Sequence, residues 1–497
     1  MVKATEHASV RHLGATMARL NVVPKLMGLG TWGLVTLPLW GALVAPLMLA
    51  WLVLLFNAYW LMRSGMLGIG AIIGLVRLRR AQAHDWLGAA GQQPDFAAVH
   101  HLVIVPTYKE ADAVLAETLD QLVRQDFPRE RIAVVLGFEA RDAGAAARAA
   151  RLLRRYRGEF GAMWALFHPL RPGEIAGKSS NLAWAAPRAR TLLQHRGIDP
   201  PRVLVTICDA DSRLHVKYLS ALSHDHLVDP DPSERLYQPA LLFHANLNRL
   251  PPPLRATNSA YSVWSLARLA LGSRLVLQST YSMPLELAHR VGYWDPDVIC
   301  EDSRICFKVL QHVGARAKVL PIYLPVLCDA AEGATPWATV VAHYQMIRRW
   351  AWGATDVPYV MRGILGTGGV RAPLGPTLGF IEDHLTWPTH WFLITVGTKM
   401  LPWVAPVMVA SPQGEFLIWA GGMLLALCLP FIVVAATIDL ILRGGPSDPS
   451  EWAGELVGWA LMPVIALVLT CLPALDAHTR MLFGRTIGYT PTPKFAR

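Results

Sequence analysis

Val203-Leu204-Val205-Thr206-Ile207-Cys208-Asp209-Ala210-Asp211-Ser212 is the stretch that decides the fold. Its first half is a short run of apolar, mostly β-branched residues, which predicts a buried strand over 203–207. Asp209 and Asp211 follow at the point where that strand should end. Ligands of open α/β sheets bind outside the carboxyl ends of the strands. Two carboxylates there can share a divalent cation, Mg²⁺ or Mn²⁺, that holds a diphosphate. The alternative is a loop whose aspartates cap the next helix.

Strands and helices alternate around this stretch, and such a βαβ series forms a parallel sheet with helices on both faces. The predicted strands cover 101–105, 132–138, 163–167, 203–207, 238–243 and 317–324. The predicted helices between the first four strands cover 111–125, 141–157 and 181–194.

Charge is distributed unevenly along the 497 residues, of which 53% are hydrophobic and 16% charged. Soluble domains carry about 25% charged residues. Residues 26–62, 416–438 and 456–475 contain no charged residue, whereas charges are frequent from 80 to 355. The sequence therefore predicts a soluble domain over 81–355 between membrane regions at 1–80 and 356–497.

The first uncharged segment has 37 residues. At about 1.5 Å per residue it is too long for one ~30 Å hydrocarbon core and slightly short for two. Because Pro46 lies near its middle, we expect a hairpin of spans near 27–45 and 47–64; one long tilted helix is the alternative. Residues 65–76 are too few to cross, so they predict an interfacial helix leading to cytoplasmic arginines at 77, 79 and 80.

In the C-terminal region, the sequence predicts membrane spans near 387–409, 416–441 and 456–475. Whether the number of crossings is odd or even stays open. Three spans would place the tail outside, whereas its basic residues favour the cytoplasmic side. Lys399 interrupts the first of these segments, which can therefore be re-entrant.

The net charge of +10 is explained by arginines at membrane ends, and no basic stripe with interleaved aromatics indicates nucleic acid. Six cysteines without a CxxC pair suit a reducing compartment.

Polar side chains also follow the first two predicted strands. Thr107 and Glu110 come after the first, in a turn of the kind that binds nucleotides. Glu139 or Asp142 comes after the second, where a carboxylate can accept a hydrogen bond from a base or cap the next helix. Lys178 follows Gly177 and opens a helix, and both the ammonium and the helix N-terminus favour phosphate. A solvated loop lysine is the alternative.

Two motifs lie further along the chain. Glu301 and Asp302 open a helix, either as dipole-stabilised caps or with a general base that faces an acceptor hydroxyl. Arg349 and Trp350 lie on an amphipathic helix predicted over 336–353. Arginine can pair with diphosphate, and tryptophan can stack on a sugar or anchor the helix at a membrane interface.

In this combination and order, the motifs resemble those of the membrane-embedded family-2 glycosyltransferases, the group of cellulose and hyaluronan synthases. The resemblance covers about 100–355 and the flanking spans. It implies a GT-A (Rossmann-like) α/β domain inserted between transmembrane helices, with its catalytic side in the cytoplasm at the inner membrane. It also implies a nucleotide-sugar donor, by family preference a UDP-sugar, and a polysaccharide or lipid-linked acceptor.

The resemblance also implies roles for individual residues. Asp302 would be the general base of an inverting transfer, with Glu301 beside it. Asp209 and Asp211 would contact the metal and the diphosphate, which Lys178 assists. The remaining donor-binding residues would be Thr107, Glu110, Glu139 or Asp142, Arg349 and Trp350.

Some features depart from the family pattern. Gln345 lies four residues before Arg349 where the pattern has three, so Arg348 can instead pair with Gln345. Cys300 stands where the synthases usually have threonine. The alternative within the enzyme class is therefore a single transfer to a polyprenyl or glycolipid acceptor instead of processive synthesis. A transporter with a regulatory domain is disfavoured, because only Lys399 lies inside a predicted span.

Overall fold

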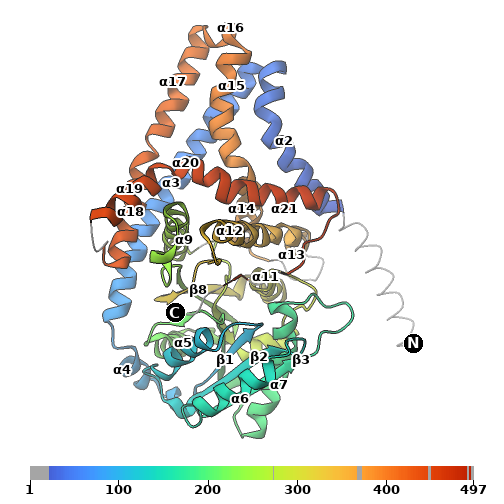
Figure 1. Cartoon of the computed structure of the whole chain (residues 1–497), viewed down its shortest axis with the longest axis vertical. Coiled ribbons are helices and arrows are strands. Elements are labelled where there is room, and N and C mark those ends of the chain that lie inside the picture. Colours follow the sequence, from blue (N-terminus) through green and yellow to red (C-terminus); the bar gives the residue numbers. More distant parts are fainter. Residues whose placement is uncertain (1–21, 273, 366–371, 446–448, 490–491, 494–497) are drawn as a thin grey trace.

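The computed structural model describes residues 22–272, 274–365, 372–445, 449–489 and 492–493. An α/β domain carries a tapering bundle of long helices, which we call the cone (Figure 1). Both ends of the chain contribute to the cone, with α2 (Val22–Val44) and α3 (Pro46–Ala83) beside α15 (Gly397–Val404), α16 (Pro406–Val409) and α17 (Pro412–Ala426).

The α/β domain is built on one mixed sheet of eight strands in the order β3-β2-β1-β4-β7-β6-β8-β5. The parallel part consists of β1 (His100–Thr107), β2 (Ile132–Glu139), β3 (Ala162–His168) and β4 (Val203–Ile207). Strand β7 (Tyr281–Pro284) runs antiparallel to both β4 and β6 (Arg235–Leu242). Strand β8 (Lys318–Leu327) is parallel to β6, and β5 (Arg213–Leu214) pairs antiparallel with β8.

Helices cover both faces of the sheet. Leu102 and Ile104 pack into a core with α7 (Lys178–His195), α10 (Leu285–Arg290) and α11 (Glu301–Val313). Val103 and Val105 point the other way, into a core with α5 (Asp112–Val123), α6 (Ala145–Arg155) and α8 (Tyr218–Val228). A strand that is buried on both faces needs apolar residues at every position, and this explains the continuous apolar runs in the sequence.

All six predicted strands are present, and the helices predicted over 111–125, 141–157 and 181–194 correspond to α5, α6 and α7. Strands β5 and β7 were missed because they have only 2 and 4 residues. Helix α9 (Pro252–Leu271) was also missed. It starts in the prolines of 251–253, which resemble a loop in sequence, although proline is well tolerated in the first turn of a helix.

The predicted break before Pro46 is present, but the separate interfacial helix predicted over 65–76 is wrong. Helix α3 continues for 38 residues, from Pro46 to Ala83. Its glycines serve packing instead of ending the helix: a Cβ at Gly70 would lie 2.9 Å from the carbonyl oxygen of Ala267 on α9. The absence of side chains therefore lets α3 and α9 approach closely.

The helices after the α/β domain begin with α12 (Pro336–Ala351), α13 (Val357–Leu365) and α14 (Leu374–Trp391). A π-helical turn joins α14 to α15, and the chain rises through both and returns through α17 and α18 (Leu429–Arg443). The span predicted over 456–475 is not one helix, because α19 (Pro449–Ala460) ends before α20 (Met462–Ala466) begins. Helices α20 and α21 (Leu472–Leu482) lie across the base of the cone (Figure 1).

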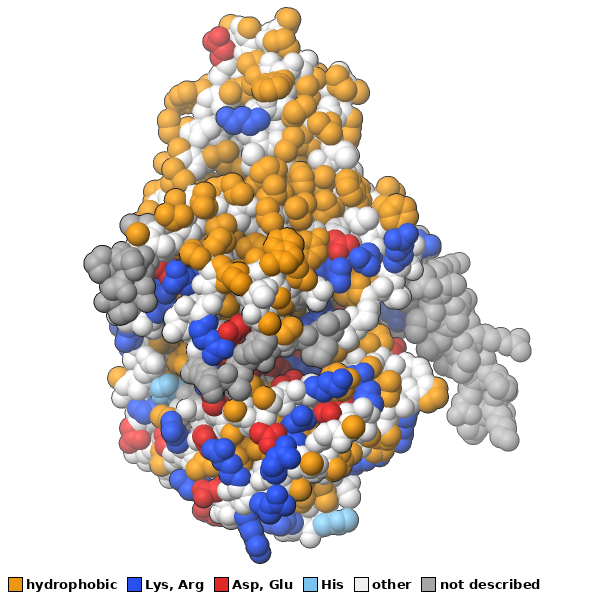
Figure 2. Space-filling model, viewed as in Figure 1, with side chains coloured by type: hydrophobic (Ala, Val, Ile, Leu, Met, Phe, Trp, Pro, Cys, Tyr) orange, Lys and Arg blue, Asp and Glu red, His pale blue; other side chains and the backbone are white. Residues whose placement is uncertain are grey.

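Among the described residues, four helices are long and apolar enough to cross a membrane: Val23–Val44, Pro46–Ala83, Pro412–Arg443 and Met462–Leu482. Hydrophobic side chains dominate the visible surface of the cone, whereas charged side chains gather on the α/β domain (Figure 2). The predicted α/β domain between membrane-length helices is therefore confirmed.

Candidate active site

The register of the sheet brings the predicted site residues to one edge. Thr107 pairs with Phe138 across β1 and β2, and Ile104 pairs with Ile207 across β1 and β4. The carboxyl ends of these three parallel strands therefore lie together. Thr107, Glu139 and Asp209 end, or directly follow, these strands, so the edge collects polar side chains from three distant parts of the sequence.

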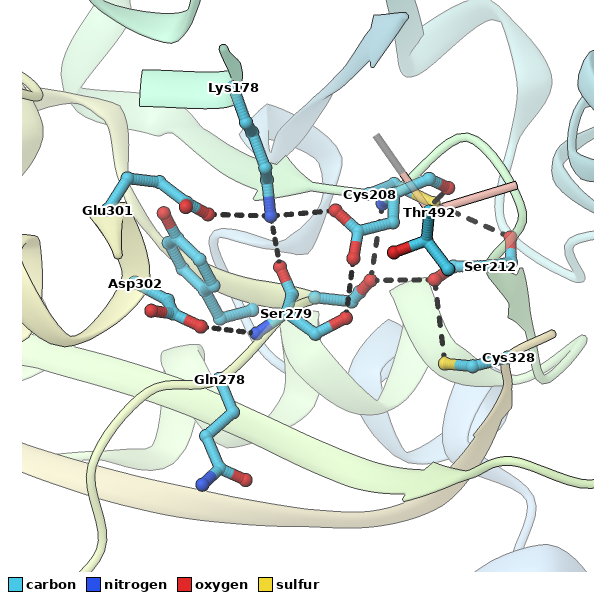
Figure 3. A network of polar contacts seen from close by, with 12 residues as sticks. Lys178, Cys208, Ser212, Gln278, Ser279, Glu301, Asp302, Cys328 and Thr492 are labelled. Atoms are coloured by element: carbon cyan, nitrogen blue, oxygen red, sulfur yellow. Dashed lines mark hydrogen bonds and ion pairs between the residues drawn. The ribbon is translucent and has the colours of Figure 1, made fainter. Parts of the chain in front are cut away.

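Lys178 lies at the centre of this edge, as the first residue of α7. Its Nζ is 2.7 Å from Oδ1 of Asp209 and 2.6 Å from Oε1 of Glu301, and it donates to the carbonyl oxygen of Ser279 at 2.7 Å (Figure 3). The lysine is thus a bridge between two acidic motifs that are 92 residues apart in the sequence. It is not the solvated loop lysine of the alternative interpretation, because its side chain is only 11% exposed.

Ser279 joins the same acids through a second set of contacts. Its hydroxyl donates to Oδ2 of Asp209 at 2.6 Å, and its N–H donates to Oδ2 of Asp302 at 2.9 Å. Asp302 also accepts from the N–H of Ser303 at 2.7 Å. One residue therefore contacts both the aspartate after β4 and the aspartate at the start of α11. Ser279 was not predicted, and its position two residues before the short strand β7 gives no sequence signal.

The charges within this network influence one another. Burial and the nearby Asp302 raise the pKa of Glu301 to about 7, although Lys178 acts in the opposite direction. Burial lowers the pKa of Lys178, but Asp209 and Glu301 outweigh this effect and raise it overall. The Lys178 ammonium therefore stays protonated between the two carboxyl groups. Because the pKa of Glu301 is about 7, the carboxyl group of Glu301 gains or loses a proton near neutral pH.

Asp211 lies deeper in the domain, only 3% exposed, and its Oδ2 accepts from the N–H of Asp329 at 3.1 Å. Mg²⁺ and Mn²⁺ prefer oxygen ligands, and Mg²⁺ is commonly held by one or two carboxylates plus substrate phosphates. Asp209 and Asp211 supply this donor type, so the residues present fit such an ion. In the described part of the chain, no group of three or more His, Cys, Asp or Glu side chains is arranged so that it could hold a metal ion by itself.

The predicted nucleoside side of the site consists of two separate clusters. After β1, the hydroxyl of Thr107 donates to Oε2 of Glu110 at 2.6 Å, so these two residues stabilise their own turn. After β2, Oε1 of Glu139 accepts from Asn181 at 3.0 Å and lies 3.0 Å from Nδ1 of His168. Asp142, the alternative to Glu139, instead accepts from the N–H of Gly144 and pairs with an arginine of α6.

His168 lies between two carboxylates and is 1% exposed. Its Nε2 is 2.9 Å from Oε2 of Glu174, in addition to the contact with Glu139. Both ring nitrogens can donate only when the imidazole is protonated. Burial lowers the pKa of His168, but the hydrogen bonds to both glutamates outweigh burial and raise it overall. Burial raises the pKa of Glu139, and its hydrogen bonds with His168 and Asn181 outweigh this and lower it overall.

The helix predicted over 336–353 is α12, which ends at Ala351. Trp350 packs edge-to-face on Tyr261 and contacts Phe243, with ring centroids 5.7 and 5.8 Å apart. Arg348 donates from Nη1 to Oδ2 of Asp476 on α21 at 2.9 Å. The Arg348–Asp476 pair joins α12 to the helix that lies above it.

The C-terminal tail returns to the site, and the sequence did not predict this. Arg349 donates to the hydroxyl of Thr492 at 3.0 Å, and its guanidinium lies 5.0 Å from the ring of Tyr489. That ring faces Gly177, where an added Cβ would lie 2.9 Å from it. The tail therefore covers the start of α7 next to Lys178, and it lies against the α/β domain.

Residues 204–438, just under half of the chain, match the sequence model of "Glycosyl transferase family group 2". No curated protein matches the chain. Similar solved structures include a mannosyltransferase from Pyrobaculum calidifontis in complex with GDP-Man and Mn²⁺, at 19% identity and a TM-score of 0.40. That comparison covers 80% of this chain and 99% of the other.

TarS residues 1–349 from S. aureus, in complex with UDP-GlcNAc, are also similar, at 14% identity and a TM-score of 0.31. That comparison covers 70% of this chain and 93% of the other. The sequence match includes the strand of Asp209, the start of α11 and the Arg349–Trp350 helix. The protein is a glycosyltransferase whose α/β domain lies between membrane-length helices.

Proposed function

We propose that this protein transfers a sugar from a nucleotide sugar, such as a UDP-sugar, to a polysaccharide or lipid-linked acceptor, with inversion at the anomeric carbon. The observation that carries the proposal is the joint contact of Ser279 with Asp209 and Asp302. A carboxylate suited to the donor side and a carboxylate suited to the acceptor side thereby lie in one network at the edge of the sheet.

In this proposal, Asp302 is the general base. It accepts the proton of the acceptor hydroxyl as that oxygen bonds to the anomeric carbon. The bond between this carbon and the diphosphate oxygen breaks, and the nucleoside diphosphate leaves. A single displacement inverts the anomeric centre. Glu301 and Lys178 position the neighbouring groups, since Lys178 contacts both Glu301 and Asp209.

A divalent cation bound by Asp209 and Asp211 would neutralise charge on the leaving diphosphate. Lys178 and Arg349 add positive charge at the same edge, and guanidinium groups suit bidentate contacts with phosphate. Thr107 and Glu139 end two neighbouring strands, and Glu110 lies in the turn after the first, which supports a place for the nucleoside there. Trp350 supplies an aromatic surface of the kind that stacks on sugars.

The position of the tail supports an even number of membrane crossings. Thr492 contacts Arg349, so the tail lies on the side of the α/β domain. Helices α2 and α3 account for one pair of crossings, and the α14–α15 and α17–α18 segments account for the other (Figure 1). The catalytic domain and the tail would then both face the cytoplasm at the inner membrane, consistent with the arginines that end α3.

The decisive experiment measures nucleoside diphosphate release by the purified full-length protein with a panel of nucleotide sugars and Mg²⁺ or Mn²⁺. We expect one donor to be turned over, with loss of activity on chelation. Since a general base contributes about 10²–10⁴-fold, Asp302→Asn should lower the rate by that factor while donor binding remains. Full turnover in this variant, or no turnover with any donor, would reject the proposal.

The size of the product separates the two acceptor classes. A processive enzyme gives long chains that remain at the top of a gel, and a single transfer gives one small glycolipid. The contact between the Arg349–Trp350 helix and the membrane-proximal α21 is compatible with either acceptor.

A further inference from the structure

A groove lies between the lower end of α3 and the α/β domain, away from the site described above. Its volume is about 540 Å³, and its lining includes Arg77, Arg80, His84, Trp86, His224 and Tyr323. It shares no residue with the Lys178–Ser279 network. Ligand pockets commonly have volumes of about 300–1,000 Å³, so the groove is large enough for a small polar group.

The groove carries excess positive charge. Arg77 and Arg80 are three residues apart on α3 and therefore lie on the same face of the helix. Arg77 donates to the hydroxyl of Tyr323 at 2.7 Å, which fixes its guanidinium in the groove wall. The side chain of Arg80 is exposed and forms no hydrogen bond or ion pair with any residue that the structure describes. Asp225 also lines the groove, but His224 lies 3.1 Å from its carboxylate.

The groove continues into the apolar outer face of α3. Ile69, Ile72, Ile73 and Val76 are large aliphatic residues that are 39–58% exposed, and they lie one to three turns above Arg80. Further down the helix, exposed arginines at positions 77, 79 and 80 take the place of these aliphatic residues. Hydrocarbon contact above and cationic contact below are therefore offered by one continuous surface.

An aromatic cluster forms the lower rim of the groove. The rings of Trp86 and His224 lie edge-to-face with centroids 5.3 Å apart, and His84 packs on Trp86 at 4.5 Å. The indole of Trp86 is held by a hydrogen bond to the carbonyl oxygen of Ala81 at 2.7 Å. Tryptophan is enriched at the headgroup level of membranes, where one side of the ring is apolar and the other is wet.

We propose that this groove binds the headgroup of an anionic phospholipid. Arg77 and Arg80 would hold the phosphate, and the acyl chains would follow the aliphatic face of α3 from Val76 upward. Basic pockets at the cytoplasmic ends of membrane helices are suited to such headgroups. A free phosphate or a nucleotide would use the cationic half of the groove but would leave the aliphatic face without a partner. The proposal is independent of the glycosyl transfer reaction.

The test uses the full-length protein purified in a neutral detergent. Native mass spectrometry or titration calorimetry would compare dioctanoyl phosphatidylglycerol with dioctanoyl phosphatidylcholine, which have the same chains. We expect the anionic lipid to bind at least tenfold more tightly. Glycerol phosphate and inorganic phosphate form a separate arm, and we expect both to bind at least tenfold more weakly than phosphatidylglycerol. Equal affinity for glycerol phosphate would overturn the lipid proposal in favour of a free phosphate site.

Arg80→Gln should weaken phosphatidylglycerol binding about tenfold or more, because it removes a charge-assisted hydrogen bond. Arg79→Gln is the matched control: it removes the same charge from the neighbouring position, but Arg79 points to the carbonyl oxygen of Ile441 on α18 instead of the groove. Arg77→Gln serves as a second variant. Equal losses for Arg79→Gln and Arg80→Gln would reduce the effect to general surface charge and overturn the proposal. Unchanged binding in both groove variants would overturn it as well.

Discussion

The ammonium of Lys178 lies 2.6 Å from the carboxylate of Glu301, and the two side chains are only 11% and 7% exposed. The same ammonium lies 2.7 Å from Asp209. Asp209 and Glu301, which lie at the ends of different elements, thus share Lys178 as a cationic partner. Removing one partner of a buried ion pair costs far more than removing a surface charge, because the other charge is left uncompensated.

Lys178→Met should therefore lower donor turnover at pH 7 by about 100-fold or more, with the acidic limb of the pH profile displaced upward. The pKa of Glu301 is already raised to about 7 by burial and neighbouring acids, and loss of the lysine removes the group that opposes this shift. The measurement is the rate of nucleoside diphosphate release between pH 5 and pH 9.

Lys308→Met is the matched control, since Lys308 also forms a partly buried pair, with Asp295 at 2.6 Å, but lies outside the network. Its pH profile should keep the wild-type shape. An unshifted profile for Lys178→Met would contradict the assigned role of the lysine.

The architecture could be predicted because its signals are local. The six longer strands are apolar runs, and Asp209 lies two residues after the end of one of them. Once the sheet is known to be parallel, the carboxyl ends of β1, β2 and β4 must share an edge. The proximity of Thr107, Glu139 and Asp209 therefore follows from the sequence without knowledge of any side-chain contact.

Ser279 and the tail could not be predicted, because nothing in their local sequence indicates a partner. Ser279 contacts the acids only because β7 inserts between β4 and β6, and a strand of 4 residues has no periodicity to detect. Tyr489 reaches Gly177 across more than 300 residues of sequence. Likewise, the pair of Arg348 with Asp476 depends on α21 lying across the base of the cone, a placement that hydropathy alone assigns to the membrane interior.

Ser279→Ala should affect the donor side of the reaction more than the acceptor side. It removes the hydroxyl that donates to Asp209 but retains the N–H that donates to Asp302. Hydrogen bonds to charged groups contribute about 1.5–3 kcal/mol, so the KM for the donor should rise about tenfold or more. The kcat should change by less than about threefold.

Steady-state kinetics with varied donor measures this split. Ser223→Ala is the control, because it removes a buried hydroxyl that contacts His101 away from the site. It can lower the stability of the protein, but it should leave kcat and the KM for the donor unchanged. A collapse of kcat at unchanged KM in Ser279→Ala would show instead that the hydroxyl acts on the base.

His168→Gln should destabilise the protein in a pH-dependent way. The folded pKa of His168 is raised by Glu139 and Glu174 above its ordinary value of 6.5. The stability that this histidine contributes is therefore fully present below about pH 6.5 and is lost as the pH rises through the folded pKa. The difference in Tm between wild type and variant should be larger at pH 6 than at pH 9.

Thermal unfolding in detergent at both pH values gives this difference. His195→Gln, at the last turn of α7, replaces a histidine that is not part of the cluster and serves as the control. Equal Tm differences at pH 6 and pH 9 would show that His168 is neutral in the folded protein.

Gly177→Ala should displace the tail. The backbone of Gly177 is extended, so alanine fits its conformation, but the new methyl group would lie 2.9 Å from the ring of Tyr489. We expect turnover to fall several-fold, because the tail contact with Arg349 is lost with it. Gly91→Ala, where an added Cβ has no neighbour within 4 Å, is the control. A double-mutant cycle isolates the contact: on a Tyr489→Ala background, Gly177→Ala should cost almost nothing. Additive losses in the double variant would mean that the glycine is required for a reason other than the tail.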